Sequence, residues 1–182
     1  MKRRAALSTL ALGLGSSKSG ALQKINYSRE LKADVIIIGG GLGGCAAALS
    51  SLKSGLTVIM CEETDWIGGQ LTSQGVPPDE HRWIEKFGCT KSYRKFRELV
   101  REFYRKNYKL TPQARNVVPL NPGKGSVSRL CAEPKVYLKC IESLLNEYIQ
   151  NKRLTLLKNT IVKSAEMEAN EIRSVKVENK SI

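Results

Sequence analysis

A run of glycines between an apolar strand and a helix of small residues most constrains what this chain can fold into. Val35–Ile38 is an unbroken β-branched run, which predicts a strand of a parallel sheet buried on both faces. The spacing Gly39-x-Gly41-x-x-Gly44 follows, and the Ala- and Leu-rich residues 43–53 predict a helix. These glycines permit a sharp turn, the close approach of a pyrophosphate and tight packing of helix on strand. The sequence therefore predicts a dinucleotide-binding loop at a helix N-terminus.

The next apolar run ends at an acid, which is the residue type expected at this place in a dinucleotide-binding unit. Gly55 suits the end of the predicted helix, and residues 57–61 predict a second parallel strand. Glu62 comes directly after that strand, where an acid would bind the ribose hydroxyls of an adenosine. Glu63 is the adjacent alternative.

Length, charge and cysteine usage limit the remaining function classes. A chain of 182 residues suits one domain or a large piece of a bigger enzyme. The net charge of +13 accompanies no nucleic-acid motif, so no nucleic-acid partner is expected. We interpret the basic residues between Lys91 and Lys124 as a solvated surface, with a patch for an anionic substrate or partner as the alternative. Five cysteines without a C-x-x-C pair, and one histidine, indicate no metal site.

The first 21 residues resemble an export signal. Residues 2–4 are basic, and residues 5–15 form an apolar stretch too short to span a bilayer, so no integral membrane segment is expected. The pair Arg3-Arg4 resembles a twin-arginine signal, which implies an exported, periplasmic protein. We expect a signal at 1–21 and a linker at 22–33; the alternative is a frayed basic terminus on a cytoplasmic protein.

Two further apolar patterns predict the rest of the fold. From residue 93 to about 108 an amphipathic helix has one side for the core, formed by Phe96, Leu99, Val100, Phe103 and Tyr104. Its basic residues, Arg97 and Arg101 among them, are expected on the charged faces. Pro134 suits the start of a helix that crosses to a third parallel strand, Leu154–Leu157. Residues 161–167 and 172–177 then predict an antiparallel pair.

A second glycine pair, Gly68-Gly69, brings a resemblance to a known family. In flavoprotein oxidoreductases of the glutathione-reductase type, such a pair follows the acid and lies against the FAD phosphates. Residues 66–78 and 128–134 resemble, more particularly, a bacterial family of FAD-dependent oxidoreductases. The resemblance implies an α/β, Rossmann-type FAD-binding domain at 34–182, with an insertion at 76–133 and a β-meander. It also implies FAD as the cofactor and a small-molecule substrate.

The fingerprint and the resemblance together give the candidate site. The predicted cofactor-binding residues belong to the two glycine segments or to the strand end between them: Gly39, Gly41, Gly43, Gly44, Glu62, Gly68, Gly69 and Gln70. The expected function is the N-terminal, FAD-binding part of a flavin-dependent oxidoreductase, incomplete at its C-terminus and inactive alone. A nicotinamide-dependent dehydrogenase is the first alternative, disfavoured by Gly68-Gly69. The second is a truncated, non-catalytic basic binding module. Neither catalytic residues nor an oligomeric state are assigned.

Overall fold

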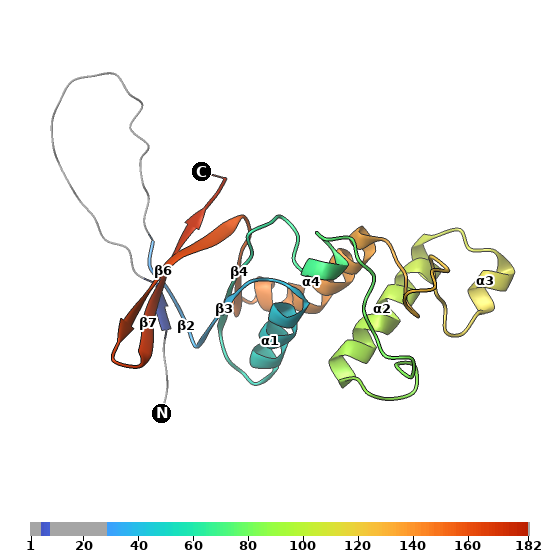
Figure 1. Cartoon of the computed structure of the whole chain (residues 1–182), viewed down its shortest axis with the longest axis horizontal. Coiled ribbons are helices and arrows are strands. Elements are labelled where there is room, and N and C mark those ends of the chain that lie inside the picture. Colours follow the sequence, from blue (N-terminus) through green and yellow to red (C-terminus); the bar gives the residue numbers. More distant parts are fainter. Residues whose placement is uncertain (1–4, 8–28, 182) are drawn as a thin grey trace, which may run out of the picture.

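The computed structural model describes residues 5–7 and 29–181, and it is built around a three-stranded parallel sheet (Figure 1). The strands are, in sheet order, β3 (Val35–Ile38), β4 (Val58–Cys61) and β5 (Leu154–Leu157). The two long helices of this unit are α1 (Leu42–Lys53), between β3 and β4, and α4 (Pro134–Gln150), before β5. The chain therefore has the predicted α/β class, and the three predicted strands pair in parallel.

The segment between β4 and α4 carries the remaining helices. These are η1 (Gly69–Leu71), α2 (Lys91–Asn107) and α3 (Pro112–Asn116). The side chain of Thr90 caps α2 by accepting a hydrogen bond from the amide of Tyr93. Phe96, Val100 and Tyr104 are buried in the core shared with α4, so the predicted apolar stripe is confirmed.

Strand β3 differs from its prediction in one respect. Only Ile37 is buried in this strand, and Ile38 is 52% exposed. The reason is the strand order, because β3 lies at the edge of the sheet and has β4 as its only neighbour among the described strands. The expectation of burial on both faces is wrong for β3 and holds for β4, where all four residues are buried.

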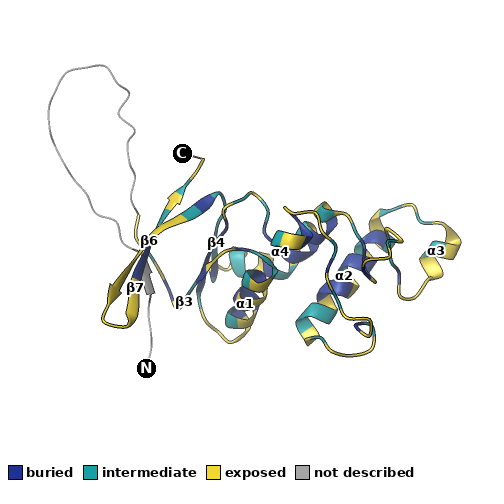
Figure 2. Ribbon diagram, in the orientation of Figure 1, coloured by how far each residue is buried: buried dark blue, intermediate teal, exposed yellow. Residues whose placement is uncertain are grey.

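Two antiparallel pairs complete the described structure. Strands β6 (Thr160–Glu168) and β7 (Glu171–Asn179) form the predicted hairpin, with two shifts of register. This hairpin projects from the parallel sheet and is mostly exposed (Figures 1 and 2). Strands β1 (Ala5–Leu7) and β2 (Leu31–Ala33) form the second pair.

The predicted division into residues 1–21, 22–33 and 34–182 stays a prediction. Residues 1–4 and 8–21 of the expected signal segment lie outside the described residues, as do 22–28 of the linker. Ala5–Leu7, within the expected signal, pair with Leu31–Ala33.

The interpretation of α2 as a helix with only solvated basic faces is wrong for two arginines. The side chains of Arg97 and Glu80 are 1% and 3% exposed, and they form an ion pair. Arg97 also pairs with Glu85, which accepts hydrogen bonds from both terminal nitrogens of Arg101, at 2.6 and 3.1 Å. The pattern of i, i+4 spacing places Arg97 and Arg101 on one side of α2. On that side, Glu80 and Glu85 of the preceding loop pair with the two arginines. The helical periodicity of the sequence does not reveal these pairs.

This buried cluster joins two loops of the insertion to α2. Burial works against the charge of Arg97, but the neighbouring carboxylates outweigh it and raise the pKa of its guanidinium. Arg101 also donates from Nε to the carbonyl of Leu120, at 2.9 Å. The loop before α2 and the loop before α4 are therefore both fastened to one face of this helix.

Replacement of Arg97 by methionine tests this account of the insertion. Arg97→Met leaves the buried carboxylate of Glu80 without its cation, so the free energy of unfolding should fall by about 3–5 kcal/mol in urea denaturation. Lys106→Met, on the same helix, breaks the exposed 3.4 Å pair with Glu102. This control should change the free energy by less than about 1 kcal/mol. Equally small losses in the two variants would contradict a structural role for the buried cluster.

Candidate functional site

The loop between β3 and α1 folds so tightly that its own packing excludes side chains at two glycines. Gly39 has a φ of 98°, and its amide donates to the carbonyl of Cys61 at 3.0 Å. A Cβ atom on Gly44 would lie 2.0 Å from the carbonyl oxygen of Gly39. A Cβ on Gly40 would lie 2.9 Å from the Cβ of Glu62. The absence of a side chain at Gly44 therefore lets α1 lie against the end of β3, and its absence at Gly40 leaves room for the side chain of Glu62.

Gly41 and Gly43 are different, because the protein itself does not require glycine there. A Cβ atom at either position would meet nothing within 4 Å. Gly41 has a φ of −60°, which any residue adopts. Open space beside a small residue at a helix start fits a ligand that approaches the backbone closely.

The start of α1 is electrostatically suited to an anion. Gly41 is the N-cap, no side chain caps the helix, and its first turn contains no acidic residue. The first amides of a helix have no partner within it, and the helix dipole adds partial positive charge at this end. The site can therefore hold phosphate oxygens without competition from a side-chain carboxylate.

The second glycine pair lies directly against the first glycine segment. The amide of Gly68 donates to the carbonyl of Gly40 at 2.7 Å, and Gly68 forms a parallel bridge with Gly41. Gly68 and Gly69 have φ values of 107° and 52°, which favour glycine. A Cβ on Gly69 would come within 3.1 Å of the Cα of Gly41. Two segments separated by a strand and a helix thus form one backbone surface.

Glu62 lies at the junction of these segments and is buried. Its Oε2 accepts from the amide of Gly40 at 2.9 Å, and its Oε1 accepts from the amide and hydroxyl of Thr64, at 2.9 and 2.7 Å. A carboxylate offers about four acceptor positions, so about one is left for a ribose hydroxyl. The sequence does not predict that Gly40 and Thr64 hold the carboxylate of Glu62. For Gly40, the run of three glycines, Gly39 to Gly41, is a signal in the sequence.

The remaining candidates differ in their surroundings. Glu63, the alternative acid, is exposed. Gln70 is also exposed, and its Nε2 donates to the carbonyl of Pro77 at 3.2 Å, at the start of the insertion. The structure therefore brings the glycines and Glu62 together, while the side chain of Gln70 contacts the insertion.

The thiol beside the glycine loop is a core group. Burial raises the pKa of Cys45 to about 12, and its Sγ donates to the carbonyl of Gly40 at 3.2 Å. Cys45 therefore stays protonated at neutral pH and packs as a small core residue.

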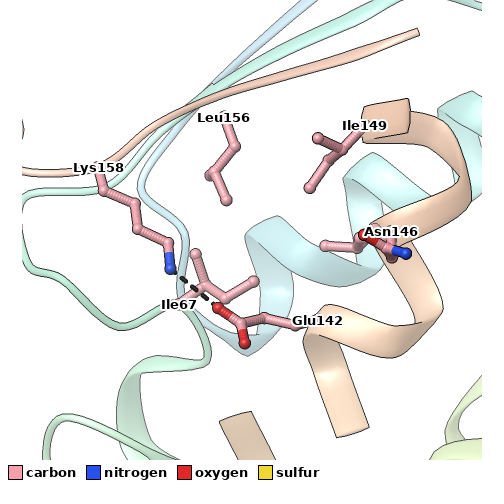
Figure 3. A pocket seen from close by; sticks show the side chains of 7 residues that line it. Ile67, Glu142, Asn146, Ile149, Leu156 and Lys158 are labelled. Atoms are coloured by element: carbon pink, nitrogen blue, oxygen red, sulfur yellow. Dashed lines mark hydrogen bonds and ion pairs between the residues drawn. The ribbon is translucent and has the colours of Figure 1, made fainter. Parts of the chain in front are cut away.

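A hollow of about 470 Å³ lies beside this region, between α4 and β5 (Figure 3). Ile67, Leu156 and Ile149 give it apolar walls. Lys158 pairs with Glu142 across it at 2.9 Å. None of the eight predicted cofactor residues lines this hollow, although Ile67 directly precedes Gly68.

The contrast between neighbouring glycines of the first segment can be tested by alanine substitution. Gly44→Ala places a methyl group against the carbonyl of Gly39 and should lower the free energy of unfolding by about 1–3 kcal/mol, as overpacking does. Gly43→Ala meets open space within α1 and should raise it by about 0.5–1 kcal/mol. Chemical denaturation of both variants measures the difference. Two variants of equal stability would refute the tight packing of α1 on the loop.

The role of Glu62 in holding the loop is tested by its amide analogue. Glu62→Gln places an NH₂ group against a donor, either the amide of Gly40 or those of Thr64, so the free energy of unfolding should fall by about 1–3 kcal/mol. Glu63→Gln alters an exposed neighbour and should change it by no more than about 0.5 kcal/mol. The expectation fails if the two variants unfold at the same denaturant concentration.

Comparison with known proteins gives partial relatives. Over 69 residues, 33% are identical to one of the subunits of the ferredoxin:CoB-CoM heterodisulfide reductase of Methanosarcina acetivorans, covering 36% of this chain and 9% of that protein. Over 55 residues, 34% are identical to the mitochondrial dihydrolipoyl dehydrogenase of Caenorhabditis elegans, covering 30% of this chain and 11% of that protein. The chain thus spans about a tenth of the length of these relatives.

Among solved structures, the L-proline dehydrogenase of P. horikoshii matches with a TM-score of 0.44 and 20% identity, covering 79% of this chain and 48% of that one. The OTEMO structure with bound FAD matches with a TM-score of 0.41 and 19% identity, covering 81% of this chain and 23% of that one. The family model of FAD dependent oxidoreductases matches residues 34–182, most of the chain. The chain therefore belongs to the FAD-dependent oxidoreductase family, its cofactor is FAD, and it carries an FAD-binding domain.

Proposed function

We propose that this domain holds the adenosine and pyrophosphate half of FAD for an oxidoreductase that acts on an unidentified small molecule. The observation that carries the proposal is the open space at Gly41 and Gly43, next to the Gly68–Gly69 backbone. Packing within the protein does not explain why Gly41 and Gly43 are glycines. A ligand that lies against the backbone at these two positions does explain it.

Each part of the site has a distinct task in this proposal. The amides at the start of α1 bind the pyrophosphate, and the helix dipole stabilises its negative charge. The remaining acceptor position on Glu62 receives a ribose hydroxyl. FAD supplies the electron transfer, while the protein binds and orients it.

The sequence before the domain supports an export route. The basic residues 2–4 and the apolar residues 5–15 have the order of a signal segment. We include an exported location in the proposal on this ground alone.

Ligand titration of the purified chain tests the division of the FAD site. FAD and ADP should both bind, and FMN should bind at least about tenfold more weakly, because the adenosine and pyrophosphate groups make the contacts. Isothermal titration calorimetry with each ligand measures this order. NADH binding more tightly than FAD would instead support the nicotinamide-dependent alternative.

A substitution in the open space locates the binding site. Gly41→Leu fits the backbone conformation and fills the space beside α1, so FAD affinity should fall by at least about tenfold with the fold retained. Ser50→Leu, on an exposed position of the same helix, is the matched control and should bind FAD normally. Unchanged FAD affinity in Gly41→Leu would exclude the glycine loop as the cofactor site.

A further inference from the structure

The loop at residues 79–90, here called the Trp83 loop, presents two large aromatic side chains to solvent. Trp83 is 47% exposed and Phe87 is 59% exposed. Their rings stack, with centroids 6.1 Å apart and planes 19° apart. His81 lies beside both rings, and its Nδ1 accepts from the amide of Trp83 at 3.2 Å. Exposed aromatic rings in contact with one another form an apolar surface patch.

The inner side of the same loop is held firmly. Ile84 is 3% exposed. Arg94 donates to the carbonyls of Ile84 and Glu85, at 3.1 and 3.2 Å. Glu80 and Glu85 turn inward to the arginines of α2, so their charges are neutralised within the protein. The aromatic patch therefore has a fixed position, because hydrogen bonds and ion pairs with α2 hold the loop that carries it.

The charges left on the outer side are mainly basic. Arg82 and Lys86 are exposed within the loop, against one exposed acid, Asp79. Lys91 and Lys95, on the first turns of α2, are exposed next to it along the chain. The loop thus separates its ionisable residues, with two acids inside and basic residues around the aromatic patch.

We propose that the Trp83 loop docks the protein on an anionic lipid bilayer. Trp and Phe rings bury favourably at the boundary between head groups and acyl chains, where tryptophan is enriched. Basic residues near an anionic surface add electrostatic attraction, and the exposed basic residues of the loop and of the start of α2 supply it here. The docking is peripheral and involves the side chains of one loop.

Within the described ranges, 5–7 and 29–181, no helix is long and apolar enough to cross a membrane.

The arrangement of the rings favours a bilayer over a nucleic acid. Single-stranded nucleic acids are bound by aromatic faces on which bases stack. The ring of Trp83 already stacks on Phe87, and the guanidinium of Arg82 lies over it, 4.2 Å from its centroid. An apolar lipid boundary receives such a stacked pair without opening it.

Fluorescence of Trp83 tests the depth of docking. The chain contains two tryptophans, so Trp66→Phe leaves Trp83 as the single reporter. With vesicles of phosphatidylcholine and phosphatidylglycerol in equal parts, its emission should shift to shorter wavelength and be quenched by lipids brominated on the acyl chains. Vesicles of pure phosphatidylcholine should give little change. Unchanged emission on the anionic vesicles would overturn the proposal.

Sedimentation with the same vesicles identifies the surface. Trp83→Ser with Phe87→Ser should reduce the bound fraction by about tenfold, because the apolar contact is lost. The matched control is Met167→Ser with Ile172→Ser, an exposed cross-strand pair on the β6–β7 hairpin at the opposite end of the molecule from α2 (Figure 1). It should bind normally. Equal loss in both double variants would refute a role for this loop.

A charge reversal and a competitor separate the remaining explanations. Lys86→Glu with Lys91→Glu should weaken vesicle binding more than Lys176→Glu with Lys180→Glu, and the difference should shrink at high salt. Binding that is abolished by an equal mass of DNA, and that does not need Trp83 or Phe87, would overturn the proposal in favour of a nucleic-acid surface.

Discussion

The buried carboxylate of Glu62 joins the parts of the molecule on which the site depends. Its side chain accepts hydrogen bonds from Gly40 and Thr64. Its amide donates to the carbonyl of Leu157, and its carbonyl accepts from the amide of Thr160. One residue thus connects the glycine loop, the end of β4 and the start of the β6–β7 hairpin. Charge-assisted hydrogen bonds of this kind are about twice as strong as neutral ones, and burial increases the cost of breaking them.

The parallel strands and the long helices could be predicted because each depends on a local pattern. The third strand has the predicted bounds, and the predicted helix starts at residue 43 and Pro134 agree with α1 and α4 within one residue. The partial exposure of β3 could not be read from its residues. Apolar runs show that a strand can be buried, whereas the neighbours in the sheet decide how far it is.

The site was predictable in part for the same reason. Glycine spacing and the acid after a strand are local signals, and they identify Gly44 and Glu62. The contact between Gly41 and Gly68 depends on how distant segments fold together. The resemblance implies only that the Gly68–Gly69 pair lies against the FAD phosphates. The inward orientation of Arg97 and Arg101 also depends on distant acids, in the loop before α2. From helical periodicity alone, both arginines are expected on the solvent-exposed side of the helix.

The glycine segments of the candidate site and the Trp83 loop are connected through one stretch of chain. Gly69 begins η1, Gln70 contacts Pro77, and the following residues lead to the ion cluster on α2. The insertion is therefore held at its start, by the contact of Gln70 with Pro77, and within its length, by the buried ion cluster.

Amide chemical shifts of the isotope-labelled chain during titration with ADP test the central claim most directly. If the two glycine segments form the phosphate surface, the amides from Gly41 to Gly44 and of Gly69 should shift first and most strongly. Shifts confined to Glu142, Asn146 and Lys158, around the hollow between α4 and β5, would contradict it.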